Sequence, residues 1–487
     1  MKKYLSIVLG ISLLFIQCSK NNDDVAPIVQ KELPIVQDFM WQTMNTYYFW
    51  QSDVAALGDD RFNNKTEYRE FLESEQEPGK FFEDKLLFSE DRFSFYSEDY
   101  KELTKAFSGV SKSNGLEFGL SRFADNNDVF GYVRYIIPNS DAASKEIKRG
   151  DLFTGVNGTT LNMANYEELL FGDKDSYTLN MAEISDNLIT DSNREVTLTK
   201  EADITENPVH ISKVLEVNGH KIGYLMYNGF TNEFDEELNE AFGTFKAAGV
   251  TDLVLDLRYN PGGSVNSARL LSSMIYGPYP DKIFLRARYN QKLQDQFNDA
   301  DLISYFSDKT QKDSPINTLG LNKVYILATG SSASSSELVM NGLAPYIDVI
   351  HIGSTTTGKN EFSVTFVDDI DNGNVYDPSR EDKINPDNQW AIQPLIGRNE
   401  NSAGFSDYTE GLAPDIDLEE DLSNLGILGN IEEPLLKKAI SEITGVTAKM
   451  DFTVHIPVKL ITSSKMFTKI KDNMYMDIKN PLPLNKE

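Results

Sequence analysis

The sequence contains one cysteine, four histidines and 46 basic residues against 75 acidic ones. A single cysteine cannot form a disulfide within the chain, so we expect no disulfide bond to stabilise the fold. The net charge of −29 argues against nucleic acid as a partner, because phosphates are bound by basic surfaces. The acidic segment 368–382 does not fit a calcium loop, since Ile370 falls at a ligand position. We expect no metal and no other cofactor.

Long apolar runs are also missing after the N-terminus. Two lysines there precede an apolar run, Leu5–Ile16, that is too short for a stable membrane span and suits a signal peptide. Cys18 follows this run, which resembles the signal of bacterial lipoproteins. We therefore expect a signal peptide over 1–17, lipidation of Cys18, a polar tether over 18–27, and export to the cell envelope with attachment through the N-terminal lipid. The alternative is an ordinary signal peptide that happens to contain a cysteine.

The remaining chain changes character along its length. Residues 28–105 have helical periodicity, in which Ile35, Phe39, Thr43 and Tyr47 share one face. Short runs separated by glycine and Asn-Gly pairs then predict a β-rich domain. We predict a multidomain α/β protein, with a helical domain over 28–105, a β-rich domain over 106–203, an α/β core over 204–445 and a C-terminal extension over 446–487.

Strands and helices alternate in the predicted core. KIGYLMYNGF (221–230) reads as a strand, and it is followed by a helix with Leu238, Ala241, Phe242 and Phe245 on one face. TDLVLDLR (251–258) is a continuous apolar run, which is typical of a strand buried on both faces. This alternation predicts a sheet covered by helices.

The stretch SSASSSELVMNG (331–342) holds five serines in its first six positions, between two apolar segments. A flexible linker has no reason to lie there, so one of these serines is a candidate nucleophile. The sequence excludes none of the four histidines as the base, because triads assemble in space: His210, His220 and His455 lie well outside the stretch, and His351 lies inside a predicted strand. A lysine is the other candidate, because a buried amine loses its proton more readily and can then accept one from a hydroxyl. The turn GSTTTGK (353–359) provides Lys359.

Five motifs together resemble the C-terminal processing peptidases, also called tail-specific proteases: IGYLMYNGF (222–230), LVLDLRYNPGG (253–263), SASSSE (332–337), GSTTTGK (353–359) and GLAPDIDL (411–418). This resemblance implies that Ser334 is the nucleophile and Lys359 the general base. A helix starting after Ser334 would offer the N–H of Ser335 to an oxyanion, and the resemblance adds the N–H of Gly262. Many family members have a glutamine where this chain has Ser363, so we assign no third catalytic residue.

The β-rich domain resembles a PDZ domain. Glu117, Phe118, Gly119 and Leu120 are similar to its carboxylate-binding loop, and the segment NSDAASKEIKRGDLFTGVNGTTL is similar to the helix, turn and strand that follow. The resemblance implies that these four residues bind peptide C-termini, with the peptide added as a strand at the sheet edge. The alternative is a β-rich spacer without a ligand.

These features predict a serine endopeptidase that binds polypeptide substrates by their exposed C-terminal tails and cleaves them with a Ser334–Lys359 dyad. The main alternative is a non-catalytic peptide-binding or scaffold protein that retains the protease fold. A hydrolase of small esters or lactams is a third possibility, although a PDZ-like domain favours polypeptides.

Overall fold

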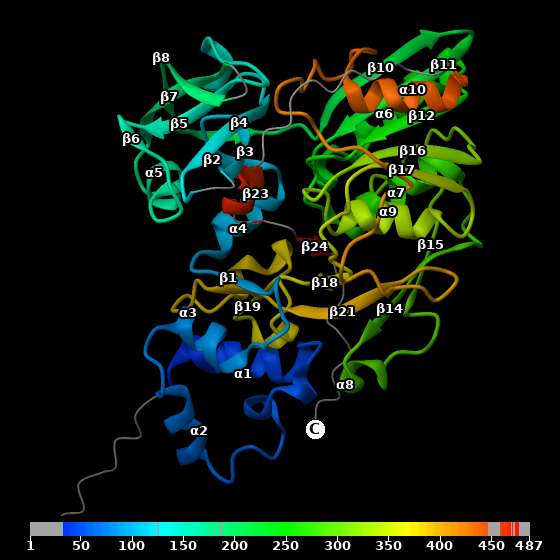
Figure 1. The fold of residues 1–487 in the computed structure, drawn as a ribbon. Coiled ribbons are helices and arrows are strands. Elements are labelled where there is room, and N and C mark those ends of the chain that lie inside the picture. The colour runs from blue at the N-terminus through cyan, green and yellow to red at the C-terminus, as the bar shows by residue number, and fades with distance from the viewer. Residues whose placement is uncertain are drawn as a thin grey trace, which may run out of the picture.

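The computed structural model describes residues 33–123, 126–185, 188–446, 458–468, 470 and 473–476. The predicted signal peptide, Cys18 and the tether lie outside the described residues. Within those residues, no helix has both the length and the apolar character needed to cross a bilayer. Figure 1 shows a helical region in blue, a β-rich lobe in cyan and an α/β region in green to orange. The predicted fold class, a multidomain α/β protein with an N-terminal helical region, is confirmed.

The N-terminal region is built on α1 (Ile35–Tyr47), which packs its apolar face into the main core. Phe39, Thr43 and Tyr47 are buried as the periodicity predicts, but Ile35 is 39% exposed. Ile35 is the first residue of the helix, and its prediction as a core residue is wrong because Leu33 and Val36, rather than Ile35, pack against the core at this end. The other elements of this region are α2 (Lys65–Leu72), α3 (Pro78–Phe81), β1 (Phe95–Ser97) and α4 (Tyr100–Phe107).

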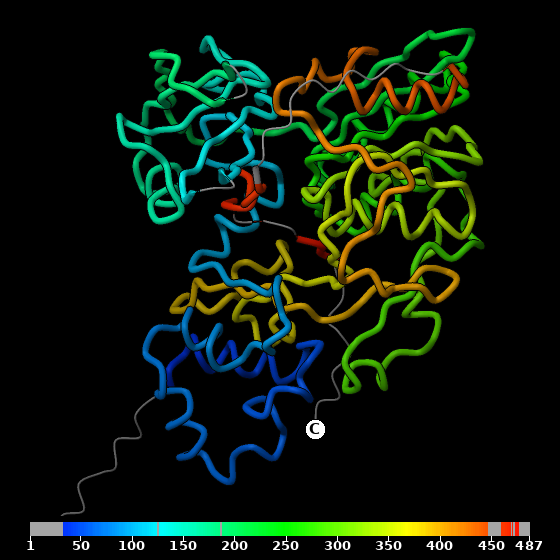
Figure 2. The backbone as a smooth tube through the Cα atoms, viewed as in Figure 1, coloured from blue at the N-terminus to red at the C-terminus, as the bar shows by residue number. Residues whose placement is uncertain are grey.

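The β-rich lobe is an antiparallel sheet in the order β23-β3-β4-β5-β7-β8, with β6 paired to β5. One edge strand, β23, comes from the C-terminal end of the chain, although its neighbours are all N-terminal in sequence (Figure 2). The elements of the lobe are β3 (Leu116–Phe123), β4 (Val129–Ile136), β5 (Leu152–Val156), β6 (Thr159–Thr160), α5 (Tyr166–Phe171), β7 (Ser176–Ser185), β8 (Leu188–Thr199) and β23 (Val458–Ser463). A separate pair, β2 (Val110–Ser113) with β9 (Glu201–Thr205), leads into the next region.

A six-stranded sheet in the order β10-β11-β12-β16-β17-β22 forms the centre of the α/β region. All of its pairs are parallel except β10 with β11. Its strands are β10 (Val209–Val217), β11 (His220–Tyr227), β12 (Asp252–Asp256), β16 (Lys323–Ala328), β17 (Asp348–Gly353) and β22 (Ile416–Asp417). Its helices are α6 (Asp235–Ala248), α7 (Val265–Tyr276), α9 (Ser335–Leu343) and α10 (Pro434–Thr444).

Strand β12 is buried on both faces, as its continuous apolar run predicts. Leu253 and Leu255 belong to the large core shared with α6 and α7, whereas Val254 belongs to the core under α10. All three side chains are fully buried. Because consecutive strand residues point to opposite faces, helices must cover both sides of the sheet. The parallel order of the strands places their carboxyl ends, which lead into the motifs, along one edge of the sheet.

A second six-stranded sheet, in the order β13-β24-β18-β21-β14-β15, lies beside this edge (Figure 1). This sheet contains β13, at the end of LVLDLRYNPGG, and β18, which follows GSTTTGK, together with β24 from the C-terminal end of the chain. Its strands are β13 (Gly263–Ser264), β14 (Ile283–Tyr289), β15 (Ile303–Tyr305), β18 (Glu361–Ser363), β21 (Leu395–Glu400) and β24 (Met474–Tyr475). The short β19 (Phe366–Val367) and β20 (Ala391–Gln393) form a small sheet with β1, and α8 (Gln291–Gln294) follows β14.

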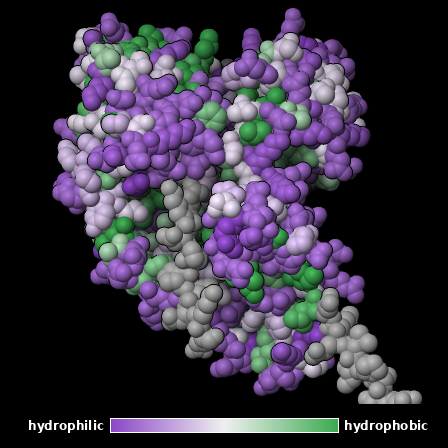
Figure 3. Space-filling view, turned by 180° about the vertical axis from the view of Figure 1, so that it is seen from behind, coloured by the Kyte–Doolittle hydropathy of each residue, from purple (hydrophilic) through white to green (hydrophobic). Residues whose placement is uncertain are grey.

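Seen from behind, the molecule presents mostly hydrophilic side chains (Figure 3). This surface agrees with the excess of acidic residues in the sequence.

Candidate active site

The serine-rich stretch forms the turn between β16 and α9. Ser334 stands directly before α9, fully buried, with φ 65° and ψ −115°. A non-glycine residue with positive φ is strained, and such strain is found where the surrounding structure holds a residue for a purpose. The turn therefore fixes one serine of the stretch in a conformation different from the others.

The neighbouring serines bind the turn to the loop that follows β12. Ser332 Oγ donates to Leu257 O at 2.8 Å, Ser335 Oγ donates to Gly263 O at 2.8 Å, and Ser336 Oγ donates to Asn260 O at 2.9 Å. Small hydroxyl side chains are needed here because they satisfy buried carbonyl groups without adding bulk. Ser332, Ser335 and Ser336 therefore have a structural explanation.

Lys359 follows the glycine turn after β17. Its side chain is almost fully buried, and Nζ lies 5.0 Å from the centroid of the Phe93 ring, which belongs to the N-terminal region. Arg92 Nη2 donates to Gly358 O at 2.6 Å. Gly358 has φ +84°, and a Cβ there would lie 2.2 Å from Thr409 O, so only glycine fits. Sequence analysis did not connect the N-terminal region with this turn.

The carboxylate of Glu337 joins the two turns. Its Oε2 accepts from the backbone N–H of Ser334 at 2.7 Å and from that of Lys359 at 2.9 Å. Its Oε1 accepts from Gly358 N and from Thr356 Oγ1. Burial raises the pKa of Glu337 to about 7, although these four hydrogen bonds favour its charged form. One carboxylate thus brings the backbones of Ser334 and Lys359 to the same place. Glu337 is the last residue of the motif SASSSE, but the sequence did not reveal this role.

Gly262 lies against Ser334. A Cβ at this glycine would meet Ser334 Cβ at 2.6 Å and Ser334 Oγ at 2.7 Å, and the residue has φ +112°. Its N–H donates to Asn260 Oδ1 at 2.9 Å. Ser335, the other predicted oxyanion donor, opens α9, where the first backbone N–H groups have no partner within the helix. The structure thus brings Ser334, Ser335 and Gly262 together, with the Gly262 N–H engaged by a side chain.

His351 is buried in β17, with its Nε2 3.1 Å from Ala328 O. Burial lowers the pKa of this imidazole. His220 pairs with Asp252 at 3.1 Å, and His210 packs against Tyr135. These contacts give the described histidines structural surroundings of their own, and His455 lies outside the described residues.

The four residues predicted to form a carboxylate-binding loop lie in strand β3. Glu117 to Leu120 pair with β4, with an irregularity in the register between Glu117 and Phe118. Gly119 and Leu120 also pair with β23 on the other side. The segment is therefore a strand rather than a loop, because both of its neighbours offer backbone partners.

The β-rich lobe is connected to the loop that follows β12 by largely buried charged side chains. Arg149 Nη1 donates to Tyr259 Oη at 2.8 Å, and its Nη2 donates to Glu420 Oε1 at 2.8 Å. Arg258 pairs with Glu420 at 3.1 Å and with Glu433 at 2.6 Å. Although burial raises the pKa of Glu420, the guanidinium groups of Arg149 and Arg258 lower it to about 2. These contacts fix the lobe to the residues that directly precede the glycine turn.

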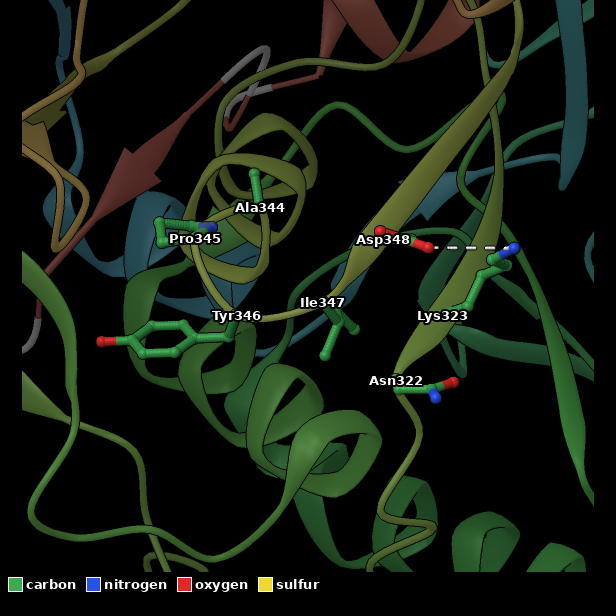
Figure 4. Close-up of a pocket in the computed structure, with 7 residues that line it drawn as sticks. All are labelled: Asn322, Lys323, Ala344, Pro345, Tyr346, Ile347 and Asp348. Atoms are coloured by element: carbon green, nitrogen blue, oxygen red, sulfur yellow. Dashed lines mark ion pairs between the residues drawn. The ribbon is translucent and has the colours of Figure 1, made fainter.

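A cavity of about 560 Å³ extends from the β-rich lobe to the glycine turn, and its lining includes Phe118, Phe171, Gly262 and Asn473. A second cavity of about 540 Å³ lies at the opposite end of α9, with Lys323 and Asp348 forming an ion pair at 3.8 Å (Figure 4). Ser334 lines neither cavity, but Gly262, which lies against Ser334, lines the first. Among the described residues, no group of three or more histidine, cysteine or acidic side chains could hold a metal.

Comparison with known proteins defines the class to which this fold and site belong. Residues 221–416 match the family model for peptidase family S41, and residues 36–95 match its N-terminal domain. The chain belongs to peptidase family S41.

The relatives agree with this class. The chain is 26% identical over 272 residues to a "Probable CtpA-like serine protease" of Staphylococcus aureus, covering 54% of this chain and 48% of that one. It is 30% identical over 169 residues to a "Carboxyl-terminal-processing protease" of Picosynechococcus, covering 34% and 39% of the two chains. The match thus spans about half or less of the length of these relatives. Among solved structures, a Bacteroides fragilis protein assigned to the S41 proteases is similar with a TM-score of 0.63 and 25% identity, over 84% of this chain and 97% of that one.

Proposed function

We propose that the protein is a serine endopeptidase of the C-terminal processing type, with Ser334 as nucleophile and Lys359 as general base. The observation that carries the proposal is the Glu337 carboxylate: one of its two oxygens, Oε2, accepts hydrogen bonds from the backbone N–H groups of both Ser334 and Lys359. The side chain of Lys359 is almost fully buried, away from bulk water.

In this mechanism, Ser334 Oγ attacks the carbonyl carbon of the scissile peptide bond while its proton passes to Lys359 Nζ. The oxygen that gains negative charge accepts from the N–H of Ser335 and from that of Gly262, once Asn260 Oδ1 has released the latter. Lys359 then protonates the leaving amine, and an acyl group remains on Ser334. Water repeats the sequence with Lys359 as base and frees the enzyme.

We propose that the substrates are polypeptides and that the β-rich lobe, within the predicted boundaries 106–203, binds their C-terminal tails. Strand β3 supports this proposal. Its edge away from β4 pairs with an added antiparallel strand, β23 of the same chain, and peptide-binding sheets bind a peptide strand in this way. The cavity from this edge to Gly262 offers a path from binding to cleavage. In the same predicted division of the chain into domains, the α/β core over 204–445 contains the proposed catalytic residues Ser334 and Lys359.

The test is cleavage of a tailed reporter peptide by the purified protein and by two variants. Ser334→Ala removes the nucleophile, and Lys359→Arg keeps a cation that cannot give up its proton in a protein. We expect both folded variants to lose nearly all activity and the double variant to lose little more, because residues that act as a unit are not additive. Cleavage by folded Ser334→Ala at the native rate would contradict the proposal and point to another active site, and no cleavage by the native protein would leave a peptide-binding protein.

We also propose that the protein is exported and lipidated at Cys18, on the basis of the apolar run Leu5–Ile16. One acyl chain binds a membrane weakly, so stable attachment requires more than one chain. Cys18→Ala should release the protein from the membrane fraction or block its processing. An unchanged membrane fraction together with an unchanged mature mass would refute the anchor.

A further inference from the structure

The C-terminal end of the chain returns to both parts of the proposed site. We call residues 458–468 together with 473–476 the C-terminal segment. Its β23 pairs with β3 of the β-rich lobe, and its β24 pairs with β13 and β18 near Ser334 (Figure 1). The segment therefore follows the same path as the cavity between the lobe and the glycine turn, and several of its residues line that cavity.

At the lobe, the segment lies where an added peptide strand would lie. β23 is antiparallel to β3, with Lys459 opposite Arg122 and Ser463 opposite Gly119. After β23, the Phe467 ring stacks on Phe171 of α5, with centroids 3.7 Å apart and an interplanar angle of 7°. An extended strand on a sheet edge with an aromatic side chain in an adjoining pocket is how such sheets bind peptides.

The charges at this end of the groove match the segment. Ser464 Oγ donates to Glu117 Oε2 at 2.6 Å and accepts from Phe118 N at 3.0 Å. Lys465 Nζ pairs with Glu206 at 3.1 Å. Burial raises the pKa of Glu117 to about 7, while Lys465 acts to lower it. The Ser464-Lys465 pair of the segment thus satisfies both acidic groups.

At the catalytic end, the segment lies directly beside Ser334. Met474 pairs with Gly263, and Ser363 Oγ donates to Asn473 Oδ1 at 2.8 Å. Asn473 O and Ser334 Oγ each lie 2.7 Å from the point that a Gly262 Cβ would occupy, so they are no farther apart than twice that distance. Asn473, Met474 and Tyr475 are all buried. A substrate backbone could not enter without displacing them.

The chemical groups next to the segment are not arranged for reaction. Among the described residues no side chain is hydrogen-bonded to Ser334 Oγ, and the Gly262 N–H is bonded to Asn260 Oδ1. A nucleophile must be hydrogen-bonded to its base, and an oxyanion needs free donors. The segment is thus bound at a site that is not assembled to cleave it.

We propose that the C-terminal segment is a built-in peptide ligand, which occupies the groove on β3 and the cleft at Ser334 and which external peptides must displace. This inference rests on the proposed function for its effect on cleavage, but the occupancy itself is a matter of binding. A ligand attached through the chain competes at an effective concentration on the order of 1 mM. Weakening its contacts should therefore open the site to peptides added from outside.

The experiment uses full-length protein with Phe467→Ala, which removes the ring stack at a position already 36% exposed, and the same chain with Met474→Asp added. Lys459→Ala is the matched control, because Lys459 is an exposed residue of the same β23. Two quantities are measured: affinity for a fluorescent peptide with the sequence of residues 458–476, and the rate of cleavage of a tailed reporter peptide. Thermal unfolding checks that each variant is folded.

We expect both Phe467→Ala variants to bind the fluorescent peptide about tenfold or more tightly than the native chain, and to cleave the reporter faster by a similar factor. Lys459→Ala should behave as native. Native-like binding and cleavage by a folded Phe467→Ala chain would overturn the inference. So would loss of the residues after Asn473 from native protein but not from Ser334→Ala, because the segment would then be a substrate. If the Phe467→Ala variants bind the peptide more tightly but no protein cleaves the reporter, the occupancy stands and the proposed catalysis fails.

Discussion

Replacing Gly262 by alanine should disable the site through a contact that the structure specifies. The new Cβ would lie 2.6 Å from Ser334 Cβ and 2.7 Å from Ser334 Oγ, at a residue with φ +112°. Residue 262 and Ser334 are both buried, so neither can move freely, and the clash must displace Ser334. A displacement of a reacting group by an amount on the order of 1 Å costs about 100-fold in rate. Overpacking also lowers the free energy of unfolding by about 1–3 kcal/mol.

Gly249→Ala provides the matched control. Gly249 ends α6 with φ +70° and has open space around its Cβ position, so alanine there adds backbone strain without a clash. The assay is the second-order rate of labelling by a fluorophosphonate, together with urea unfolding. We expect Gly249→Ala to label at the native rate with a small loss of stability. A folded Gly262→Ala protein that labels at the native rate would refute the placement of this glycine against the nucleophile.

Three further results are expected. Arg258→Met should lower the free energy of unfolding by about 3–5 kcal/mol in urea, because it leaves Asp256 and Glu433 buried without their cation; an unchanged midpoint would contradict the network. The labelling rate should fall as pH falls through about 7, because protonating Glu337 replaces an acceptor by a donor that faces backbone N–H groups; an identical pH profile in Glu337→Gln would contradict this cause. The effect of Glu337 on stability runs the other way. Because its folded pKa is raised above the ordinary value of 4.5, its contribution to the free energy of unfolding should increase as pH falls from 7 to 4.5. In this pH range, Glu337→Gln should lose that part of the pH dependence of its urea midpoint.

The sequence was most informative where local pattern and chemistry coincide. The apolar run 251–258 predicted a strand buried on both faces, because side-chain alternation has no polar face to offer there. The resemblance also paired Ser334 with Lys359, and in the structure Glu337 accepts hydrogen bonds from the backbone N–H groups of both residues. The role of Glu337 needed coordinates, since a glutamate after a serine run reads equally well as an ordinary first-turn residue of a helix.

The path of the C-terminal segment could not be predicted. Its strand β23 pairs with β3, more than 300 residues earlier, and pairing over such a distance leaves no periodic signal in either partner. The same limit applies to Phe93 beside Lys359, which depends on how the N-terminal region packs. Ile35 shows the reverse error, because a correct helical period does not reveal that Leu33 and Val36, rather than Ile35, pack against the core at the start of the helix.

The most direct test of the central claim is to locate the fluorophosphonate adduct by peptide mapping in native, Lys359→Arg and His351→Ala proteins. The account predicts one adduct, on Ser334, formed at near-native rate in His351→Ala and nearly absent in Lys359→Arg. An adduct on another residue, or labelling of Ser334 that survives in Lys359→Arg and is lost in a folded His351→Ala protein, would contradict the Ser334–Lys359 dyad.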